Sequence, residues 1–166
     1  MSIRIVHATL EDLPGVMAIE LSGFDEQLAA SRETYRKRIE AYADTFLVAK
    51  DSASGEPVGF ICGPAHRERF VQDQMYEIAV PNPPHGGHQL VLTVAVLPHW
   101  RQSGIAGALL DALAGQARRS GRESIALTCL KALIPFYERN GYTNVGVAAS
   151  SHGDRQWFNM EKRLDR

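Results

Sequence analysis

The stretch that most constrains the fold of this chain is an apolar segment that passes through a short turn into a helix. Leu90–Leu97 is almost wholly apolar, which is typical of a strand covered on both faces, and the strand is predicted to end at Pro98. A helix is predicted over Gly107–Ser120, because apolar side chains recur at four-residue intervals from Leu109. The unpaired amides and the positive dipole end at the start of that helix face one point. The segment therefore predicts an anion-binding turn.

Small residues occupy this turn where an anion would have to approach the backbone. It reads Arg101, Gln102, Ser103, Gly104, Ile105 and Ala106, followed by Gly107. Gly104 has no Cβ and Ala106 has no bulky side chain, so a phosphate would meet little obstruction there. The turn lacks the G-x-G-x-x-G pattern of dinucleotide sites and the Gly-Lys-Ser/Thr of a Walker A loop. An ordinary strand-to-helix turn capped by glycine stays open as an alternative.

Bulk composition narrows the classes of protein that this chain can belong to. Its 166 residues predict a single domain over residues 1–166, and a net charge of −1 gives no reason to expect nucleic acid or an anionic membrane as a partner. No apolar run approaches the roughly 20 residues of a membrane span, and the N-terminus lacks the pattern of a signal peptide. Cys62 and Cys129 lie in apolar surroundings and are predicted to be buried free thiols, and the histidines lack metal-ligand spacing. We expect a cytoplasmic protein without a metal.

Hydrophobic patterns along the whole chain predict its fold class. The predicted strands are Ile3–His7, Thr45–Lys50, Pro57–Gly63, Leu90–Leu97, Ser124–Leu130, Tyr142–Ala149 and Gln156–Leu164. The predicted helices run from Thr9 or Asp12 to Leu21, within Leu28–Tyr42, over Gly107–Ser120 and over Ala132–Asn140, with a helical turn or two in Arg67–Tyr76. Loops are predicted at 81–87 and 150–154. This order predicts an α/β (α+β) domain, a mixed central sheet of about seven strands with helices on both faces.

Two segments carry a resemblance to a known family. Arg101-x-x-Gly104-x-Ala106 resembles the acyl-CoA signature of the GCN5-related N-acetyltransferases (GNAT), and Pro135–Tyr142, with a Phe-Tyr pair before Gly-aromatic, resembles their later signature. Leu127–Tyr137 is similar to the arylalkylamine (serotonin) N-acetyltransferase branch and its bacterial relatives. That branch has two histidines on the central strand, where this chain has leucines, and its proline-containing loop has no match in Asp25–Ser31. The resemblance therefore implies a GNAT-like acyltransferase fold and leaves aromatic-amine specificity open.

The resemblance also implies acetyl-CoA as co-substrate and direct attack by an amine, without an acyl-enzyme. The backbone of 102–107 would bind the pyrophosphate, while Arg101 either adds a charged contact or is a solvated surface residue. Pantetheine would pair with backbone groups of the central strand and lie near the Phe-Tyr pair. The cofactor-binding residues of these two parts are Val94, Ala95, Val96, Phe136 and Tyr137. Tyr137 is the candidate acid that protonates the leaving thiolate, and a core aromatic is the alternative role for it.

The acceptor is predicted to be a primary amine of a small molecule, whose ammonium must lose a proton before attack. Candidates for that step, directly or through water, are Glu20, Glu77, His85 and His88. Glu20, Asp25 and Glu26 could give the amine end a negative field, or they are a solvated helix end. A peptide or protein acetyltransferase (lysine or N-terminal) and a non-catalytic acyl-CoA-binding module are the alternatives. A homodimer is a common default for such a domain.

Overall fold

Two β-sheets form the centre of the molecule in the computed structural model, which describes residues 2–24, 29–149 and 155–164. The first sheet has the order β1-β2-β3-β6 and is antiparallel. Its strands are β1 Ile3–His7, β2 Phe46–Asp51, β3 Pro57–Cys62 and β6 Thr93–Val96. The second sheet has the order β4-β5-β7-β9-β8, and only its β5–β7 pair is parallel within the described ranges. Its strands are β4 Ala65–His66, β5 His88–Leu90, β7 Ser124–Leu130, β9 Trp157–Arg163 and β8 Thr143–Val147.

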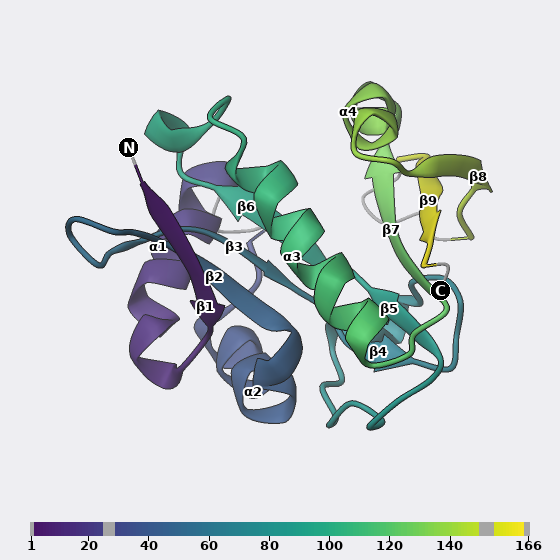
Figure 1. Cartoon of the computed structure of the whole chain (residues 1–166), viewed down its shortest axis with the longest axis horizontal. Coiled ribbons are helices and arrows are strands. Elements are labelled where there is room, and N and C mark those ends of the chain that lie inside the picture. Colours follow the sequence, from purple (N-terminus) through teal and green to yellow (C-terminus); the bar gives the residue numbers. More distant parts are fainter. Residues whose placement is uncertain (1, 25–28, 150–154, 165–166) are drawn as a thin grey trace.

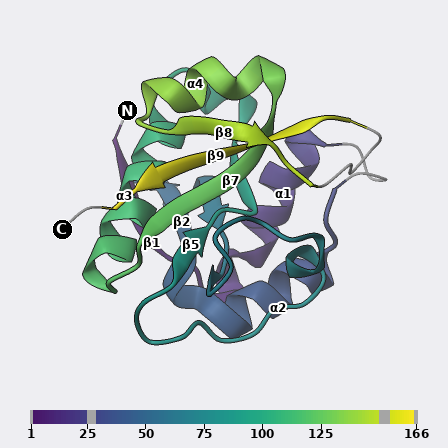
Figure 2. The same cartoon turned by 90° about the vertical axis from the view of Figure 1, so that its right-hand side faces the viewer.

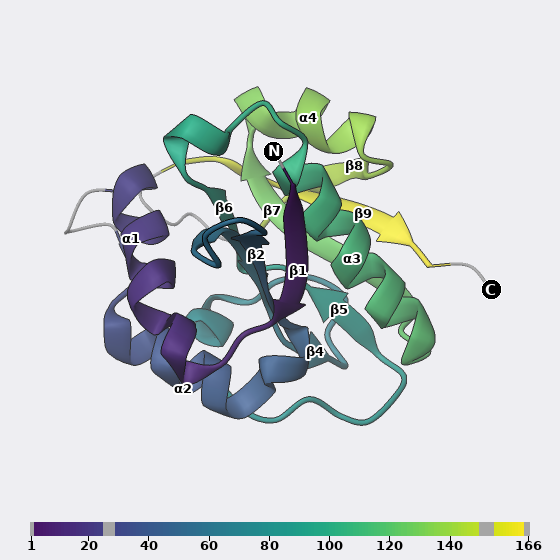
Figure 3. The ribbon, with the colours of Figure 1, turned by 60° about the vertical axis from the view of Figure 1, so that its left-hand side comes forward.

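Helices cover both faces of the first sheet, as Figure 3 shows. α1 Leu13–Gly23 and α2 Arg32–Tyr42 lie on one face and α3 Ile105–Arg119 on the other, while α4 Ile134–Arg139 contacts the second sheet. Successive side chains of a strand point to opposite faces, so Phe46 and Val48 of β2 pack with α1 and α2, while Leu47 and Ala49 pack with α3. In the second sheet β7, β9 and β8 lie side by side, with α4 at one end (Figure 2). The predicted α/β class with helices on both faces is confirmed.

The prediction of one mixed sheet of about seven strands is wrong in one respect, because the strand predicted over Leu90–Leu97 is broken. β5 ends at Leu90 and β6 begins at Thr93. The N–H of Val91 still donates to the carbonyl of Ala126 in the second sheet (2.9 Å), whereas the N–H of Leu92 donates to the carbonyl of Cys62 in the first (2.8 Å). The chain thus changes sheets between two adjacent residues, which gives nine strands in two sheets over the described residues.

Two residues allow the chain to change sheets at this point. At Gly63 an added Cβ would lie 1.9 Å from the carbonyl oxygen of Leu90, so only glycine permits the two backbones to cross there. Gln89 is fully buried, and its side-chain amide donates to the carbonyls of Gly63 (3.0 Å) and Leu90 (2.9 Å). Beyond Ala126, β7 continues beside β9 alone, so β6 and β7 diverge.

Other predicted boundaries shift by a few residues. Thr9 precedes a 3₁₀ turn over Leu10–Asp12 and α1 follows Asp12, so both predicted starts mark a real boundary. Ser31 caps α2 by accepting the N–H of Thr34 at 3.1 Å. The helix predicted over Ala132–Asn140 is a 3₁₀ turn, Lys131–Leu133, followed by α4, and in Arg67–Tyr76 only Asp73–Tyr76 is helical. The loop predicted at 150–154 lies outside the described residues. Over the described ranges, a helix with the length and apolarity needed to traverse a bilayer was not found.

Candidate functional site

A cleft of about 650 Å³ lies where β6 and β7 diverge. The backbone that changes sheets forms one wall with β6, and the free half of β7 forms the opposite wall. Helices α1 and α2 and the segment around the 3₁₀ turn Asp73–Tyr76 close the far end. The lining of the cleft includes Glu20, Phe24, Arg38, Asp73, Tyr76, Glu77, Val94, Tyr137 and Trp157. Of the predicted cofactor residues, Val94 and Tyr137 share this cleft.

The edge of β6 offers backbone groups to this cleft. Leu97 donates its N–H to the carbonyl of Val58 at 2.8 Å, which makes these two residues a hydrogen-bonded pair of the antiparallel β3–β6 ladder. Such pairs alternate with non-hydrogen-bonded ones, so the N–H and C=O groups of Val94 and Val96 point away from β3. Those of Ala95 face β3 and are not available to a ligand in the cleft. An amide-rich chain that lies against β6 can therefore pair with Val94, which lines the cleft, and with the N–H of Val96, whose carbonyl already accepts the Nε of Arg101.

The turn after β6 has the geometry of an anion site. Gln102 and Gly104 have φ angles of +64° and +83°, in the left-handed region, which turns successive N–H groups toward one side. The first hydrogen bond of α3 runs from the N–H of Ala108 to the carbonyl of Gly104 (3.0 Å), and the N–H groups of 102–107 have no hydrogen bond to any residue that the structure describes. The turn is solvent-exposed at 101–104, while Ile105 is buried and anchors the helix.

Two exposed side chains of the turn donate hydrogen bonds to backbone carbonyls. The Nε of Arg101 donates to the carbonyl of Val96 at 2.9 Å, so this guanidinium links the turn to β6. The hydroxyl of Ser103 donates to the carbonyl of Trp100. The backbone N–H groups of 102–107 are thus the main unpaired donors of the turn. The terminal nitrogens of Arg101 also make no hydrogen bond to any described residue.

Tyr137 lies on the cleft wall at the first turn of α4. It is 7% exposed, and its ring packs edge-to-face on Phe136 (5.0 Å between centroids) and Tyr142 (5.9 Å). Burial raises the pKa of the Tyr137 hydroxyl, and the neighbouring Cys129 thiol raises it further, so the phenol is protonated at neutral pH. Its hydroxyl makes no hydrogen bond with any described residue, which leaves the proton available to a ligand. Phe136 does not line the cleft and instead supports the Tyr137 ring.

Close contact between α3 and α4 brings the turn and Tyr137 together. An added Cβ at Gly107 would lie 3.0 Å from Oδ1 of Asn140, which follows α4 directly. The side-chain amide of Asn140 donates in turn to the carbonyl of Phe136 at 2.9 Å. Gly107 therefore acts through the space it leaves for α4, in addition to its backbone amide.

The four candidates for removing the amine proton separate into two pairs. Glu20 and Glu77 line the cleft. Glu20 is 4% exposed, with Oε2 accepting the N–H of Ala30 (2.9 Å) and Oε1 buried without a partner among residues 2–24, 29–149 and 155–164, whereas Glu77 is exposed. His85 is exposed and does not line the cleft. The predicted acidic neighbours of Glu20, Asp25 and Glu26, lie outside the described residues.

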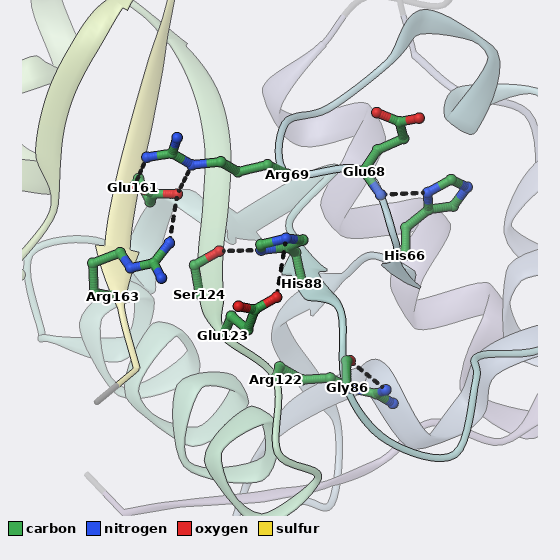
Figure 4. Close-up of polar contacts among 10 residues, drawn as sticks. All are labelled: His66, Glu68, Arg69, Gly86, His88, Arg122, Glu123, Ser124, Glu161 and Arg163. Atoms are coloured by element: carbon green, nitrogen blue, oxygen red, sulfur yellow. Dashed lines mark hydrogen bonds and ion pairs between the residues drawn. The ribbon is translucent and has the colours of Figure 1, made fainter. Parts of the chain in front are cut away.

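His88 is engaged elsewhere, at the opposite end of β7, as Figure 4 shows. Its Nδ1 lies 2.7 Å from the hydroxyl of Ser124, and its Nε2 lies 3.6 Å from a carboxylate oxygen of Glu123. Ser124 is fully buried, and neither residue lines the cleft. His88 therefore ties β5 to the start of β7 and does not reach the site.

The residue that the sequence analysis missed is Arg38 of α2. It is 2% exposed and lines the cleft, with Nη2 donating to the carbonyl of Tyr76 (3.1 Å) and Nη1 to the Cys62 sulfur (3.8 Å). Its guanidinium also lies over the Tyr35 ring, 5.0 Å from the centroid. A signal was present in the sequence, because a charged residue stands on the apolar face of the helix formed by Tyr35 and Ile39.

Both cysteines are buried free thiols that stay protonated at neutral pH. Burial raises the pKa of Cys62 and of Cys129 to about 11, so both are protonated at neutral pH, and neither lines the cleft. The described part of the chain contains no cluster of three or more His, Cys, Asp or Glu side chains that could hold a metal ion.

Comparison with known proteins adds a family and a fold. The family model of the acetyltransferase (GNAT) domain matches residues 43–144. GphF, a GNAT-like decarboxylase solved with isobutyryl-CoA, superposes with a TM-score of 0.81 at 18% identity, over 98% of this chain and 100% of that one. Naa20 of Chaetomium thermophilum, solved with a bisubstrate analogue, gives 0.73 at 22% identity, over 99% and 87%.

The ribosomal-protein-S18-alanine N-acetyltransferase of Escherichia coli gives a TM-score of 0.71 at 18% identity, over 99% of this chain and 96% of that one. At identities this low, the structural likeness concerns the fold. Comparison with curated protein sequences found no significant match.

Proposed function

Because the chain belongs to the acetyltransferase (GNAT) family and is therefore an acyltransferase, we propose that it moves an acetyl group from acetyl-CoA to the primary amine of a small molecule. The observation that carries this proposal is the cleft between β6 and β7, where unpaired backbone of β6 and the hydroxyl of Tyr137 face the same space. A thioester placed against that strand would lie beside a proton donor. Its carbonyl carbon could then be reached from the part of the cleft that α1 and α2 line. The likeness to the arylalkylamine branch stays a prediction.

In the proposed binding mode, the cofactor follows three groups of backbone donors and acceptors. The pyrophosphate lies at the N–H groups of 102–107, which have no partner within the described chain. The pantetheine amides pair with the N–H and C=O groups of Val94 and with the N–H of Val96, as an added strand would. Arg101 connects the two regions through its bond to Val96, and its remaining nitrogens are available to a phosphate.

In the proposed reaction, the neutral amine attacks the thioester carbonyl directly. A C–N bond forms, the C–S bond breaks, and the thiolate takes the proton of the Tyr137 hydroxyl, which solvent later replaces. The amine becomes neutral by giving one proton to Glu20, directly or through water, because Glu20 is the buried carboxylate of the cleft and one of its oxygens has no partner among the described residues. The second proton leaves the nitrogen for solvent once the C–N bond has formed, and it balances the proton that solvent returns to Tyr137. Cys62 and Cys129 are protonated and do not line the cleft, which supports transfer without an acyl-enzyme.

The enclosure of the far end supports a small acceptor over a peptide. Side chains from α1, α2, the turn Asp73–Tyr76 and β9 all reach the cleft, so it is surrounded on several sides. A peptide acceptor would need an open groove. A thiol-release assay with acetyl-CoA, over a panel of arylalkylamines, polyamines, amino acids and peptides, tests the proposal.

We expect turnover with free amines and little with peptides. Turnover confined to peptides would replace the small acceptor with a protein substrate. Binding of acetyl-CoA without turnover on any amine would leave a non-catalytic acyl-CoA module, and no heat of acetyl-CoA uptake in calorimetry would overturn the cofactor site.

A further inference from the structure

The far end of the cleft contains a buried positive charge that has no negative partner among the described residues. Arg38 is 2% exposed, and none of the ion pairs within the described residues involves it. Its recorded partners are neutral, namely a carbonyl, a protonated thiol and an aromatic ring, and its Nε has no partner. Burial of an unpaired guanidinium is strongly unfavourable unless an anion compensates for it. A cation held this way at the wall of a cleft indicates an anionic ligand.

A buried negative charge stands in the same cleft. Glu20 of α1 is 4% exposed, and its Oε1 has no partner, while Oε2 is fixed by the N–H of Ala30. Glu20 and Arg38 lie on consecutive helices that pack against each other, yet no ion pair joins them. Two opposite charges that the fold buries around one space, without pairing them, are suited to a ligand that carries both signs.

Apolar rings surround the remaining space. Phe24, Tyr76 and Trp157 all line the cleft, and Asp73 and Glu77 are the other charged residues among its described lining residues. Arg38 is thus the one basic residue among these lining residues, beside three acidic ones. An acceptor with an ammonium, a single carboxylate and an apolar body would match this distribution of charge and surface.

We propose that the acceptor is an amino acid, whose carboxylate binds Arg38 and whose amine lies at Glu20. This inference rests on the proposed acetyl transfer and narrows its acceptor to amines that carry a neighbouring carboxylate. The guanidinium provides planar N–H donors that fit a carboxylate, while the free oxygen of Glu20 receives an ammonium hydrogen and then its proton.

Matched compounds test the carboxylate directly. Acetylation of phenylalanine, leucine and methionine is compared with that of the corresponding amino-acid amides and decarboxylated amines, by thiol release. We expect kcat/KM for the preferred amino acid to exceed that for its amide by about 10- to 100-fold, since a charge-assisted contact to a buried cation is lost with the carboxylate. Peptides that begin with the same residue should behave as the amide does.

Variants of α2 separate recognition from folding. Arg38→Gln should reduce the acid-to-amide ratio of kcat/KM toward one, and Arg38→Lys, which keeps the charge, should retain part of it. Arg36→Gln is the matched control, because Arg36 lies on the exposed side of the same helix and pairs with Glu33 and Glu40. A purely structural role of Arg38 would change both substrates alike and leave the ratio unaltered.

Three outcomes overturn the inference while leaving acetyl transfer intact: equal kcat/KM for acids and amides, a preference for the decarboxylated amines, or an unchanged ratio in Arg38→Gln. If no compound is turned over, calorimetric binding of the same acids and amides to the complex with coenzyme A decides. Binding of the acids alone supports the amino-acid site even though the proposed transfer has failed. Equal or absent binding of the acids overturns the site as well.

Discussion

Tyr137 has the two properties that a proton donor to a thiolate needs, a retained proton and an unoccupied hydroxyl. Burial raises its pKa, so the phenol does not ionise near neutrality, and no described residue accepts its hydrogen bond. Tyr137→Phe keeps the ring and its contacts with Phe136 and Tyr142. We expect turnover to fall by about 100-fold or more with acetyl-CoA affinity nearly unchanged, measured by thiol release and calorimetry. Unchanged turnover would leave Tyr137 as a core aromatic.

Glu20 and Glu77 are two carboxylates of one cleft with very different burial. Glu20 is 4% exposed and held by Ala30, while Glu77 is exposed to water. Because general-base catalysis contributes about 10²- to 10⁴-fold, Glu20→Gln should lower kcat by about 100-fold, and Glu77→Gln should change it less than threefold. The pair serve as controls for each other in a steady-state assay. The opposite order of effects would assign the base to Glu77.

Residues with a local sequence motif could be predicted, and residues that act through the tertiary fold could not. Tyr137 and the turn around Gly104 are recognisable because their neighbours along the chain form the pattern. Arg38 has no motif, and only its place on the apolar face of α2 distinguishes it from the exposed Arg36. His88 has the chemistry of a base, but the sequence did not reveal that its ring bonds to Ser124 at 2.7 Å.

At the scale of elements, the close approach of Gly107 in α3 to Asn140, which follows α4, connects the turn before α3 to the helix that carries Tyr137. α3 crosses the centre of Figure 1, and α4 lies beside the end of β7. Gly107→Ala and Gly115→Ala make the same change in one helix. At Gly115 the new Cβ would lie 3.5 Å from Arg119, an ordinary contact, whereas at Gly107 it would lie 3.0 Å from Asn140.

Alanine has the better helix propensity, so Gly115→Ala should raise the free energy of unfolding by about 0.5–1 kcal/mol. Gly107→Ala should gain less or lose stability, because Asn140 must move while bonded to Phe136. It should also raise KM for acetyl-CoA. Chemical denaturation and steady-state kinetics of both variants check this. Equal stabilisation with unchanged kinetics would mean that α4 does not depend on this contact.

The break in Leu90–Leu97 shows why element boundaries are harder to predict than element types. An apolar run reports that a strand is buried, and it does not report which neighbour pairs with it. The change from Ala126 to Cys62 as hydrogen-bond partner between Val91 and Leu92 leaves no trace in hydrophobicity. Gly63 and Gln89 allow this change of partner. Gly63 lies far from Val91 in the sequence, and Gln89 belongs to no motif that would mark it.

At the scale of the whole molecule, the order of strands and helices was sufficient to predict the α/β class, but it could not predict the division into two sheets. Each predicted strand has a counterpart in the structure, and β7 has the predicted bounds. The division depends on long-range pairings, β3 with β6 and β5 with β7, that join residues far apart in the chain. The cleft lies where that division makes β6 and β7 diverge.

The burial of ionisable groups throughout the core makes the stability of the whole molecule sensitive to alkaline pH. Burial raises the pKa of Cys62 from 9.0 to about 11 and raises the pKa values of Tyr42 and Tyr142 as well. A thiol with a higher pKa when folded keeps its proton in the folded state and releases it on unfolding. The stability linked to Cys62 is therefore fully present below pH 9 and is lost as the pH rises through about 11.

A shift of this size corresponds to about 3 kcal/mol for Cys62 once the pH exceeds the folded pKa. We expect the free energy of unfolding, from urea denaturation, to be nearly constant between pH 7 and about 8.5 and then to fall steeply, with the tyrosines adding to the loss above about pH 10. In Cys62→Ala the stability at pH 8 is lower because a packed side chain is lost, but the decrease between pH 8 and pH 11 should be smaller by about 2 kcal/mol, since pH 11 only reaches the folded pKa. The comparison of the two decreases is independent of the starting stability. An identical decrease in both proteins would show that the Cys62 thiol does not remain protonated because of its burial, and that other groups cause the alkaline loss.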